Sequence, residues 1–295
     1  MTRGRSPWAL GLLVAVACSG DAVDPWPNDT DDTDVSVDHW ALTDAFVPIA
    51  HRGGALLGPE NTLEAIALSV AAGIEVVEID LFMTSDGHLV VFHDKTVDRT
   101  TDGSGRIQDM TLAEAQALDA GYAFTLDGGA TFPFRGQGVQ IPTWEQAMAE
   151  FPDLYWDVEI KQTEPSINDA VAASIEAAGI RDKVFIACFD DPTIRDFRAA
   201  YPDWVTNMGD DEYALWTSLA EDGESSYEPP GEIAQIWDVF YNDSLPAKAD
   251  RTDVTLHVWT VNNRDLMSQL LSEGVDGIIT DDPITLLEVM AEQGL

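Results

Sequence analysis

Apolar runs and amphipathic stretches alternate along the chain from about residue 46 onward. Short apolar runs bounded by turn residues predict strands, and the stretches between them repeat their apolar positions at helical spacing. The expected strands are Val47–His51, Val76–Phe82, Tyr155–Lys161, Val184–Phe189, Val205–Met208, Ala234–Trp237, Thr255–Val261 and Gly277–Thr280. The expected helices are Asn61–Ala72, Ser166–Ala178, Asp191–Ala200, Glu212–Leu219, Arg264–Ser272 and Pro283–Glu292.

This alternation predicts the architecture. Eight strands with crossover helices indicate a parallel α/β fold, and a (β/α)8 TIM barrel suits a chain of 295 residues with a short extension. The start of the first helix is predicted at Asn61, an N-cap residue type, because Glu64 follows three residues later in a capping-box arrangement.

One apolar run follows its predecessor too closely for a helix to intervene. Leu89–His93 comes soon after Phe82, and Asp86-Gly87 between alternating apolar residues indicates a hairpin. A two-residue turn would place His93 directly across the ladder from Asp80, with Cβ atoms about 5 Å apart. A longer loop with a different register is the alternative.

Two predicted strands carry charge on the face that should point into the barrel. Glu78 and Asp80 share one face of the expected strand Val76–Phe82. Asp157, Glu159 and Lys161 repeat the arrangement on the expected strand Tyr155–Lys161. Buried charge is costly unless it is paired or binds metal. Three carboxylates at the barrel mouth suit Ca²⁺ or Mg²⁺ better than zinc, which favours His or Cys ligands. A structural ion-pair network is the alternative.

Two histidines end predicted strands at the same mouth. His51 precedes Arg52-Gly53-Gly54, and His93 ends the hairpin. Imidazole titrates near neutrality, so this pair beside a carboxylate cluster can act as general acid and general base. Arg52 can hold a phosphate with two parallel hydrogen bonds, and Lys161 can add a point charge.

Several motifs occur in the order found in one known family. They are HRGG with PENT, EIDLFMTSDG, FHD with RTTDGSG, IPTWEQA, VEIK, VWTVN and GVDGIITDDP, and they span about residues 48–290. Together they resemble the glycerophosphodiester phosphodiesterases. The resemblance implies a TIM barrel that uses a divalent metal to hydrolyse glycerophosphodiesters to an alcohol and sn-glycerol 3-phosphate.

Matched position by position, the resemblance implies a role for each residue. His51 and His93 match the acid/base pair, whereas Arg52 and Lys161 match phosphate-binding residues. The matched metal ligands are Glu78, Asp80 and Glu159, and Trp259 matches an aromatic near the substrate, with core packing as its alternative role. Residues 121–140 match a small insertion after the hairpin, and their Gly and aromatic content predicts a loop over the mouth.

Charge and the N-terminal region bear on partners and location. The formal charge of −38 excludes nucleic acid as a plausible partner, and an anionic substrate would need local positive charge. Residues 1–18 have the basic start and short apolar run of a signal peptide, and Cys18 resembles the lipidated cysteine of bacterial lipoproteins. Residues 19–43 predict an acidic, disordered linker before a catalytic domain at 44–295.

These observations predict an exported protein of the bacterial envelope that is tethered to a membrane through Cys18. A periplasmic or secreted protein is the alternative. Two other functions are alternatives to a glycerophosphodiesterase: phospholipase D-type hydrolysis of lysophospholipids or sphingolipids on the same barrel, and a calcium-binding surface lipoprotein without activity. The intact set of His51, His93, Glu78, Asp80 and Glu159 argues against an inactive barrel.

Overall fold

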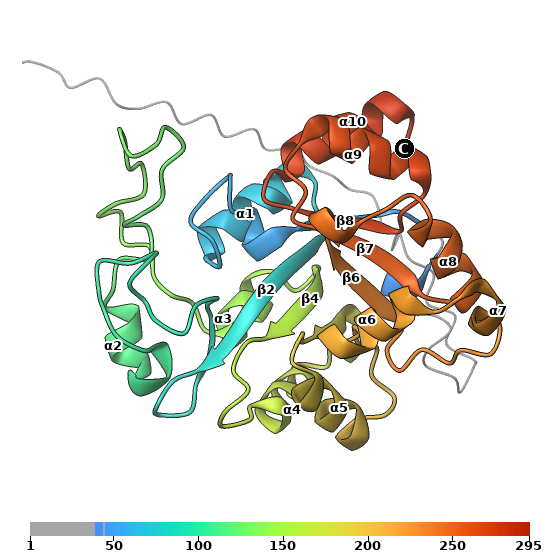
Figure 1. The fold of residues 1–295 in the computed structure, drawn as a ribbon. Coiled ribbons are helices and arrows are strands. Elements are labelled where there is room, and N and C mark those ends of the chain that lie inside the picture. Colours follow the sequence, from blue (N-terminus) through green and yellow to red (C-terminus); the bar gives the residue numbers. More distant parts are fainter. Residues whose placement is uncertain (1–38, 44) are drawn as a thin grey trace, which may run out of the picture.

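The computed structural model describes residues 39–43 and 45–295. Parallel strands pair in the order β5-β4-β2-β1-β8-β7-β6, and β3 pairs antiparallel with β2 (Figure 1). The strands are β1 (Val47–Ala50), β2 (Val76–Met83), β3 (Leu89–Val91), β4 (Tyr155–Ile160), β5 (Val184–Ala187), β6 (Ile233–Trp237), β7 (Thr255–Trp259) and β8 (Gly277–Thr280).

The predicted strand Val205–Met208 closes the sheet without forming a regular strand. Thr206 pairs with Ile186 of β5, and Asn207 pairs with Ile233 of β6. The Asn207 amide also donates to the Ile186 carbonyl at 3.0 Å. These bridges join the two edges of the sheet, so the predicted barrel is confirmed.

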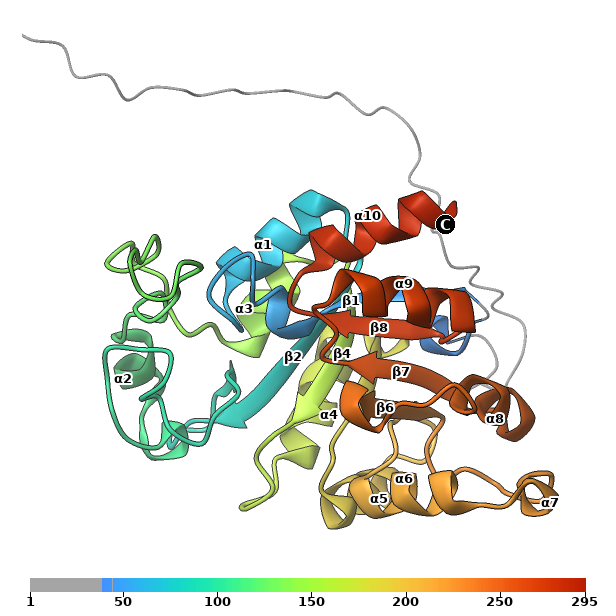
Figure 2. The same cartoon turned by 45° about the horizontal axis from the view of Figure 1, so that its top comes forward.

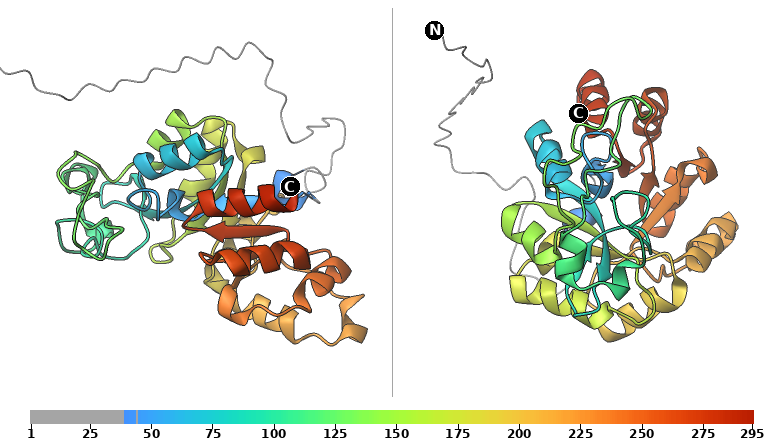
Figure 3. Two further views of the ribbon diagram at one scale, coloured as in Figure 1. Left: turned by 90° about the horizontal axis from the view of Figure 1, so that it is seen from above. Right: turned by 90° about the vertical axis from the view of Figure 1, so that its left-hand side faces the viewer.

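Helices surround the sheet, as the end-on view shows (Figure 3, right). They are α1 (Leu63–Ala72), α2 (Leu112–Gln116), α3 (Trp144–Glu150), α4 (Asn168–Ala178), α5 (Asp191–Ala200), α6 (Asp210–Ser218), α7 (Glu221–Glu224), α8 (Leu245–Thr252), α9 (Arg264–Glu273) and α10 (Pro283–Gln293). Outward-facing strand residues such as Val158 and Val258 pack beneath them, whereas inward residues such as Ile49 and Phe185 form a separate core inside the barrel. Alternating strand faces therefore separate the two cores.

The hairpin register differs by one residue from the predicted one. Leu81 pairs with Val91, and the turn holds three residues between Thr84 and His88. The Phe92 amide donates to the Asp80 carbonyl at 2.8 Å, so Phe92, and not His93, lies across from Asp80. The Thr84 hydroxyl donates to Asp86 and accepts from the His88 amide, which stabilises the longer loop that was the alternative.

The end of the predicted linker also differs from expectation. His39, Trp40 and Ala41 are buried beneath the barrel, and the Trp40 ring lies 5.2 Å from that of Tyr155 and 5.6 Å from that of Phe185. These apolar contacts explain why this short segment packs against the barrel and does not extend into solvent. The signal peptide, Cys18 and the rest of the linker lie outside the described residues.

The segment between β3 and α3 projects beyond the end of the barrel to which the strand arrows point (Figures 1 and 2). It includes the predicted insertion, residues 121–140. Among residues 39–43 and 45–295, no helix is long and apolar enough to cross a membrane.

Candidate active site

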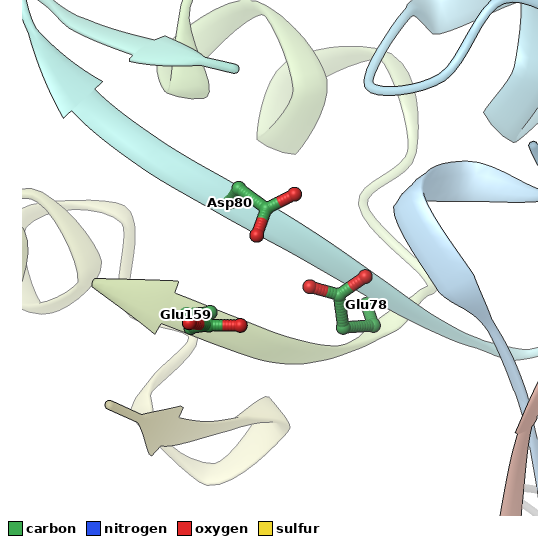
Figure 4. A group of neighbouring side chains, drawn as sticks. All are labelled: Glu78, Asp80 and Glu159. Atoms are coloured by element: carbon green, nitrogen blue, oxygen red, sulfur yellow. The ribbon is translucent and has the colours of Figure 1, made fainter. Parts of the chain in front are cut away.

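Three carboxylates converge at the mouth of the barrel. Asp80 of β2 pairs in register with Glu159 of β4, and Glu78 lies one inward position earlier on β2 (Figure 4). One carboxylate oxygen from each of these three residues lies within 4.8 Å of the others. Glu78 and Asp80 are buried, so the period-two alternation does place the acids inside the barrel, as predicted.

The electrostatics of this cluster are those of a cation site. Burial, followed by the nearby Asp80, Asp157 and Glu159 charges, raises the pKa of Glu78 well above its usual value. Burial likewise raises the pKa of Glu159 to about 7, although Lys161 opposes this shift. The Asp80 Oδ1 atom is buried and has no hydrogen-bond partner within the described chain. A hard divalent cation would relieve this repulsion and bind the oxygen that lacks a hydrogen bond, so the residues fit Ca²⁺ or Mg²⁺.

Two cations border the cluster. The Lys161 Nζ atom lies 2.5 Å from Glu159 Oε1 and 3.4 Å from Asp80 Oδ1, while the Arg52 Nε atom lies 3.7 Å from Asp80 Oδ2. Although burial raises the pKa of Asp80, its neighbours, Lys161 foremost, hold it below its usual value. Positive charge therefore accompanies the acids, as an anionic phosphate would require.

The HRGG segment turns the chain sharply so that it reaches this cluster. Arg52 has φ of 50°, and its backbone N–H donates to Glu78 Oε2 at 2.7 Å. Gly53 and Gly54 also have positive φ, and a Cβ atom on Gly54 would clash with the Ser69 hydroxyl. The strained turn thus binds one carboxylate through its backbone while its side chain faces another.

Asn61 is a site residue that sequence reasoning assigned to another role. The N-cap of α1 is Thr62, whose hydroxyl accepts from the Ala65 amide, and the predicted Asn61 cap is wrong. Asn61 instead has φ of 58° and donates from Nδ2 to Asp80 Oδ2 at 2.7 Å. Its Oδ1 accepts from the Asp80 amide at 3.3 Å, so the side chain fixes the orientation of the carboxylate.

His51 is held by a carboxylate from the last strand-helix connection. The His51 Nδ1 atom lies 2.6 Å from Asp281 Oδ1, and the Asn262 amide donates to Asp281 Oδ2 at 2.6 Å. The His51 Nε2 atom lies 3.9 Å from Glu78 Oε2. One ring nitrogen is thus oriented by Asp281, and the other faces the carboxylate cluster.

His93 reaches the same cavity although the predicted ladder position was wrong. Regular pairing in β3 ends at Val91, and the chain then turns so that the His93 side chain lines the cavity beside Glu78 and Glu159. The His93 Nδ1 atom lies 2.6 Å from Asp94 Oδ1. Burial, aided by Lys161 and Arg52, lowers the pKa of His93, although Asp80 and Asp94 oppose the shift.

A network of ion pairs joins the His93 side of the site to the Arg52 side. Arg99 donates from Nε to Asp94 at 2.6 Å and from Nη1 and Nη2 to Glu60, both at 2.7 Å. Glu60 in turn accepts from Arg52 Nη1 at 3.0 Å. Arg99 thereby connects the partner of His93 with the partner of Arg52.

The wall opposite these groups is aromatic and amide-lined. Trp259 and Phe189 line the cavity with ring centroids 5.2 Å apart, so Trp259 lies in the cavity wall. Deeper in the barrel, Gln235 Nε2 donates to Asp157 Oδ2 at 2.5 Å, and burial raises the pKa of Asp157 well above its usual value. All eight residues predicted for the site gather here: His51, Arg52, Glu78, Asp80, His93, Glu159, Lys161 and Trp259.

The sequence did not identify several other residues that contact the predicted site residues or line the cavity. These are Glu60, Asn61, Asp94, Arg99, Phe189, Gln235, Asn262 and Asp281. Several stand inside the quoted motifs, such as PENT, FHD and IITDDP, so the signal was present as a motif. Which residues these motifs contact could not be predicted, because the contacts depend on how loops distant in the sequence are arranged in space.

Comparison with known proteins accords with this geometry. The model of the glycerophosphoryl diester phosphodiesterase family matches residues 51–285. The chain belongs to this family. This confirms the predicted family and, with it, the prediction that the protein is a glycerophosphodiester phosphodiesterase. The glycerophosphodiester phosphodiesterase of Caldanaerobacter subterraneus is 33% identical over 254 residues, covering 83% of this chain and 98% of that protein.

Solved structures of the family share the fold. The crystal structure of the putative glycerophosphoryl diester phosphodiesterase from Silicibacter pomeroyi is similar, with a TM-score of 0.71, 25% identity and coverage of 85% of this chain and 95% of that one. A phosphodiesterase of Oleispira antarctica in complex with the product sn-glycerol-3-phosphate has a TM-score of 0.70 and 26% identity, covering 85% of this chain and 99% of that one.

Proposed function

We propose that this protein hydrolyses glycerophosphodiesters to an alcohol and sn-glycerol 3-phosphate, with a divalent cation and two histidines. The observation that carries the proposal is one cavity in which three clustered carboxylates meet His51 and His93, each with its own carboxylate partner. The similar Oleispira enzyme, solved with sn-glycerol-3-phosphate, supports the choice of substrate class.

The three carboxylates Glu78, Asp80 and Glu159 would hold the cation. When bound, Ca²⁺ or Mg²⁺ stabilises negative charge on phosphoryl oxygens. Arg52 and Lys161 border the same acids, so they would bind the phosphate from the side and neutralise charge that develops on it. The Arg52 and Lys161 side chains are both held by ion pairs before substrate arrives, which limits their reorganisation during the reaction.

The histidines would move the protons. Nδ1 of each ring lies 2.6 Å from an aspartate, which leaves Nε2 of each ring for the substrate. One ring would take a proton from the nucleophile, and the other would donate a proton to the leaving alkoxide. Burial, aided by Lys161 and Arg52, lowers the pKa of His93 and so favours the neutral ring, which can accept a proton.

A substrate panel tests the proposal. Purified protein is assayed with glycerophosphocholine, glycerophosphoethanolamine and glycerophosphoglycerol in the presence of Ca²⁺, Mg²⁺ or a chelator. We expect sn-glycerol 3-phosphate and the free alcohol, with His93→Ala at least about 10²-fold slower in kcat. His88→Ala, which removes an exposed histidine of the same hairpin, is the matched control and should be unaffected. Release of phosphocholine and glycerol, or an unimpaired His93→Ala, would contradict the proposal.

We also infer that the protein is exported and tethered by a lipid on Cys18. The basic start, the short apolar run and the small residues before Cys18 support this inference. Mass spectrometry of protein from its native membranes should show a chain that begins at a lipid-modified Cys18. An unprocessed N-terminus starting at Met1 would contradict export by this route.

A further inference from the structure

A row of aromatic rings leads from the catalytic cavity to the surface. The aromatic row consists of Phe189, Trp259, Trp237 and Phe240. Successive ring centroids are 5.2, 6.4 and 5.6 Å apart, and the rings of Trp237 and Trp259 are nearly parallel, with an interplanar angle of 19°. The first two rings line the cavity that contains His51 and His93.

The strand register explains why the row forms. Trp237 ends β6 and Trp259 ends β7, and the two residues pair directly across the ladder. Both follow Gln235 and His257 by two positions, so they share the inward face at the mouth. The chain then continues into Asp238–Phe240, a single 3-10 turn that brings the Phe240 ring against Trp237.

The outer half of the row is unusually exposed. Trp237 is 50% exposed and Phe240 is 60% exposed, and the adjacent Val239 is 64% exposed. Large apolar side chains at the surface are costly to solvate when they lie together, and grouped ones mark binding sites. Here the exposed group is continuous with the catalytic cavity, which connects it to the substrate.

The shape of the aromatic row indicates which part of a substrate it could bind: glycerol, a quaternary ammonium group or an extended apolar chain. A three-carbon glycerol cannot reach all four rings, so the constant part of a glycerophosphodiester does not account for the outer two. A quaternary ammonium would be held by rings that surround one point. These rings instead follow one another outward, and the exposed Val239 is next in sequence to the last ring, an arrangement that suits an extended apolar chain.

We propose that the aromatic row binds the acyl chain of a lysophospholipid whose phosphodiester lies in the catalytic cavity. This inference rests on the proposed function, because it uses the same hydrolysis at the same site. One water is consumed: its oxygen ends on phosphorus, the bond from phosphorus to the head-group oxygen breaks, and that oxygen takes up a proton. Lysophosphatidate and the head-group alcohol are the products.

Two substrates that share a scissile bond test the proposal. Glycerophosphocholine and hexanoyl-lysophosphatidylcholine both release choline, and they differ in the acyl chain alone. The short chain keeps the lysolipid monomeric, so that binding to an aggregate does not enter the measurement. We expect the wild-type protein to have a kcat/KM at least about tenfold higher for the lysolipid, because the chain adds buried apolar surface.

Variants at the outer end of the row separate the acyl-chain site from the catalytic site. Phe240→Ala and Trp237→Ala should lower kcat/KM for the lysolipid about tenfold, mainly through KM, and leave that for glycerophosphocholine unchanged. Leu126→Ala is the matched control, because Leu126 is 63% exposed but belongs to the insertion after β3. It should change neither value.

The outcomes that overturn the inference are distinct from failure of the proposed function. If wild-type protein cleaves glycerophosphocholine but gains nothing from the acyl chain, the inference is wrong and the proposed function stands. Equal losses on both substrates in Phe240→Ala would show a structural role for the row. A loss on glycerophosphocholine with none on glycerophosphoethanolamine would assign the rings to the choline cation. No turnover of any diester would contradict the proposed function itself.

Discussion

The His51 Nδ1 atom lies 2.6 Å from Asp281 Oδ1, although 230 positions separate the two residues. Burial raises the pKa of Asp281, but the hydrogen bond and charge of His51, together with Asn262 and Arg52, hold that pKa below its usual value. An ionised Asp281 fixes the His51 tautomer, which leaves Nε2 as the nitrogen that our proposal assigns to proton transfer. The contact depends on closure of the barrel, because β1 and β8 pair side by side.

Asp281→Asn should therefore lower kcat for glycerophosphocholine by about 10²-fold or more while the fold remains intact, because an amide no longer favours the productive tautomer. Steady-state kinetics and circular dichroism check this prediction. Asp282→Asn is the control: Asp282 caps α10 at the next position, and asparagine also caps well, so this variant should retain near wild-type kcat. Similar rates in both variants would remove Asp281 from the mechanism.

At Asn61 we expect the backbone conformation and the side-chain amide to have separate effects on stability and metal affinity. Its φ of 58° suits asparagine or glycine, and its amide orients Asp80. Asn61→Gly keeps the backbone conformation but removes the amide, so we expect metal affinity to fall about 10- to 100-fold with little loss of stability. Calorimetric metal titration and thermal unfolding measure the two effects. Unchanged metal affinity would show that Asp80 does not need this partner.

We expect Arg99 to couple His93 to Arg52, because it bonds the carboxylate partner of each. Removing it frees both Asp94 and Glu60, so Arg99→Ala should lower kcat about tenfold, with Arg99→Lys rescuing only part of the loss because lysine cannot form the paired hydrogen bonds to Glu60. The pKa of Asp94 is about 2 beside Arg99 and His93, despite the opposing effect of burial. Full rescue by lysine in the pH-rate profile would show that charge alone matters.

Buried His39 predicts a pH-dependent loss of stability. Burial lowers its pKa from 6.5 to about 4, and its ring bonds the Val184 carbonyl at 3.2 Å. The unfolded chain takes up a proton below pH 6.5 that the folded protein does not bind until about pH 4, so stability falls as the pH decreases through this range. From pH 7 to 5 the contribution is about 2 kcal/mol.

Urea unfolding of wild-type protein and His39→Leu at both pH values measures this contribution. The wild-type protein should lose about 2 kcal/mol more than the variant between pH 7 and 5. Identical pH dependence in the two proteins would show that His39 is protonated without cost in the fold.

The sequence predicted the parts of the molecule that follow from alternation. Inward charges at Glu78, Asp80 and Glu159 were readable because apolar residues occupy the opposite faces of both strands. The hairpin register was not readable, because Asp86-Gly87 is compatible with both a two-residue and a three-residue turn, and the Thr84 contacts select the latter. A one-residue difference therefore changed the partner of Asp80.

Other features required tertiary context. The seven-residue α3 is too short for a clear helical period, although Thr143 and Gln146 form a capping box that is visible in the sequence. Asn61 has the residue type of an N-cap, but the neighbouring Thr62 takes that role and frees Asn61 to bind Asp80. Competition between adjacent capping residues is decided by packing against distant strands.

The measurement that tests the central claim most directly is the metal dependence of sn-glycerol 3-phosphate release. Protein stripped with a chelator is assayed on glycerophosphocholine while Ca²⁺ or Mg²⁺ is added back, in parallel with Asp80→Asn and with Glu75→Gln, an exposed residue just before β2, as control. We predict no release from the stripped protein, full recovery in the wild type and Glu75→Gln, and little recovery in Asp80→Asn. Full activity in the chelator, or in Asp80→Asn, would contradict the account.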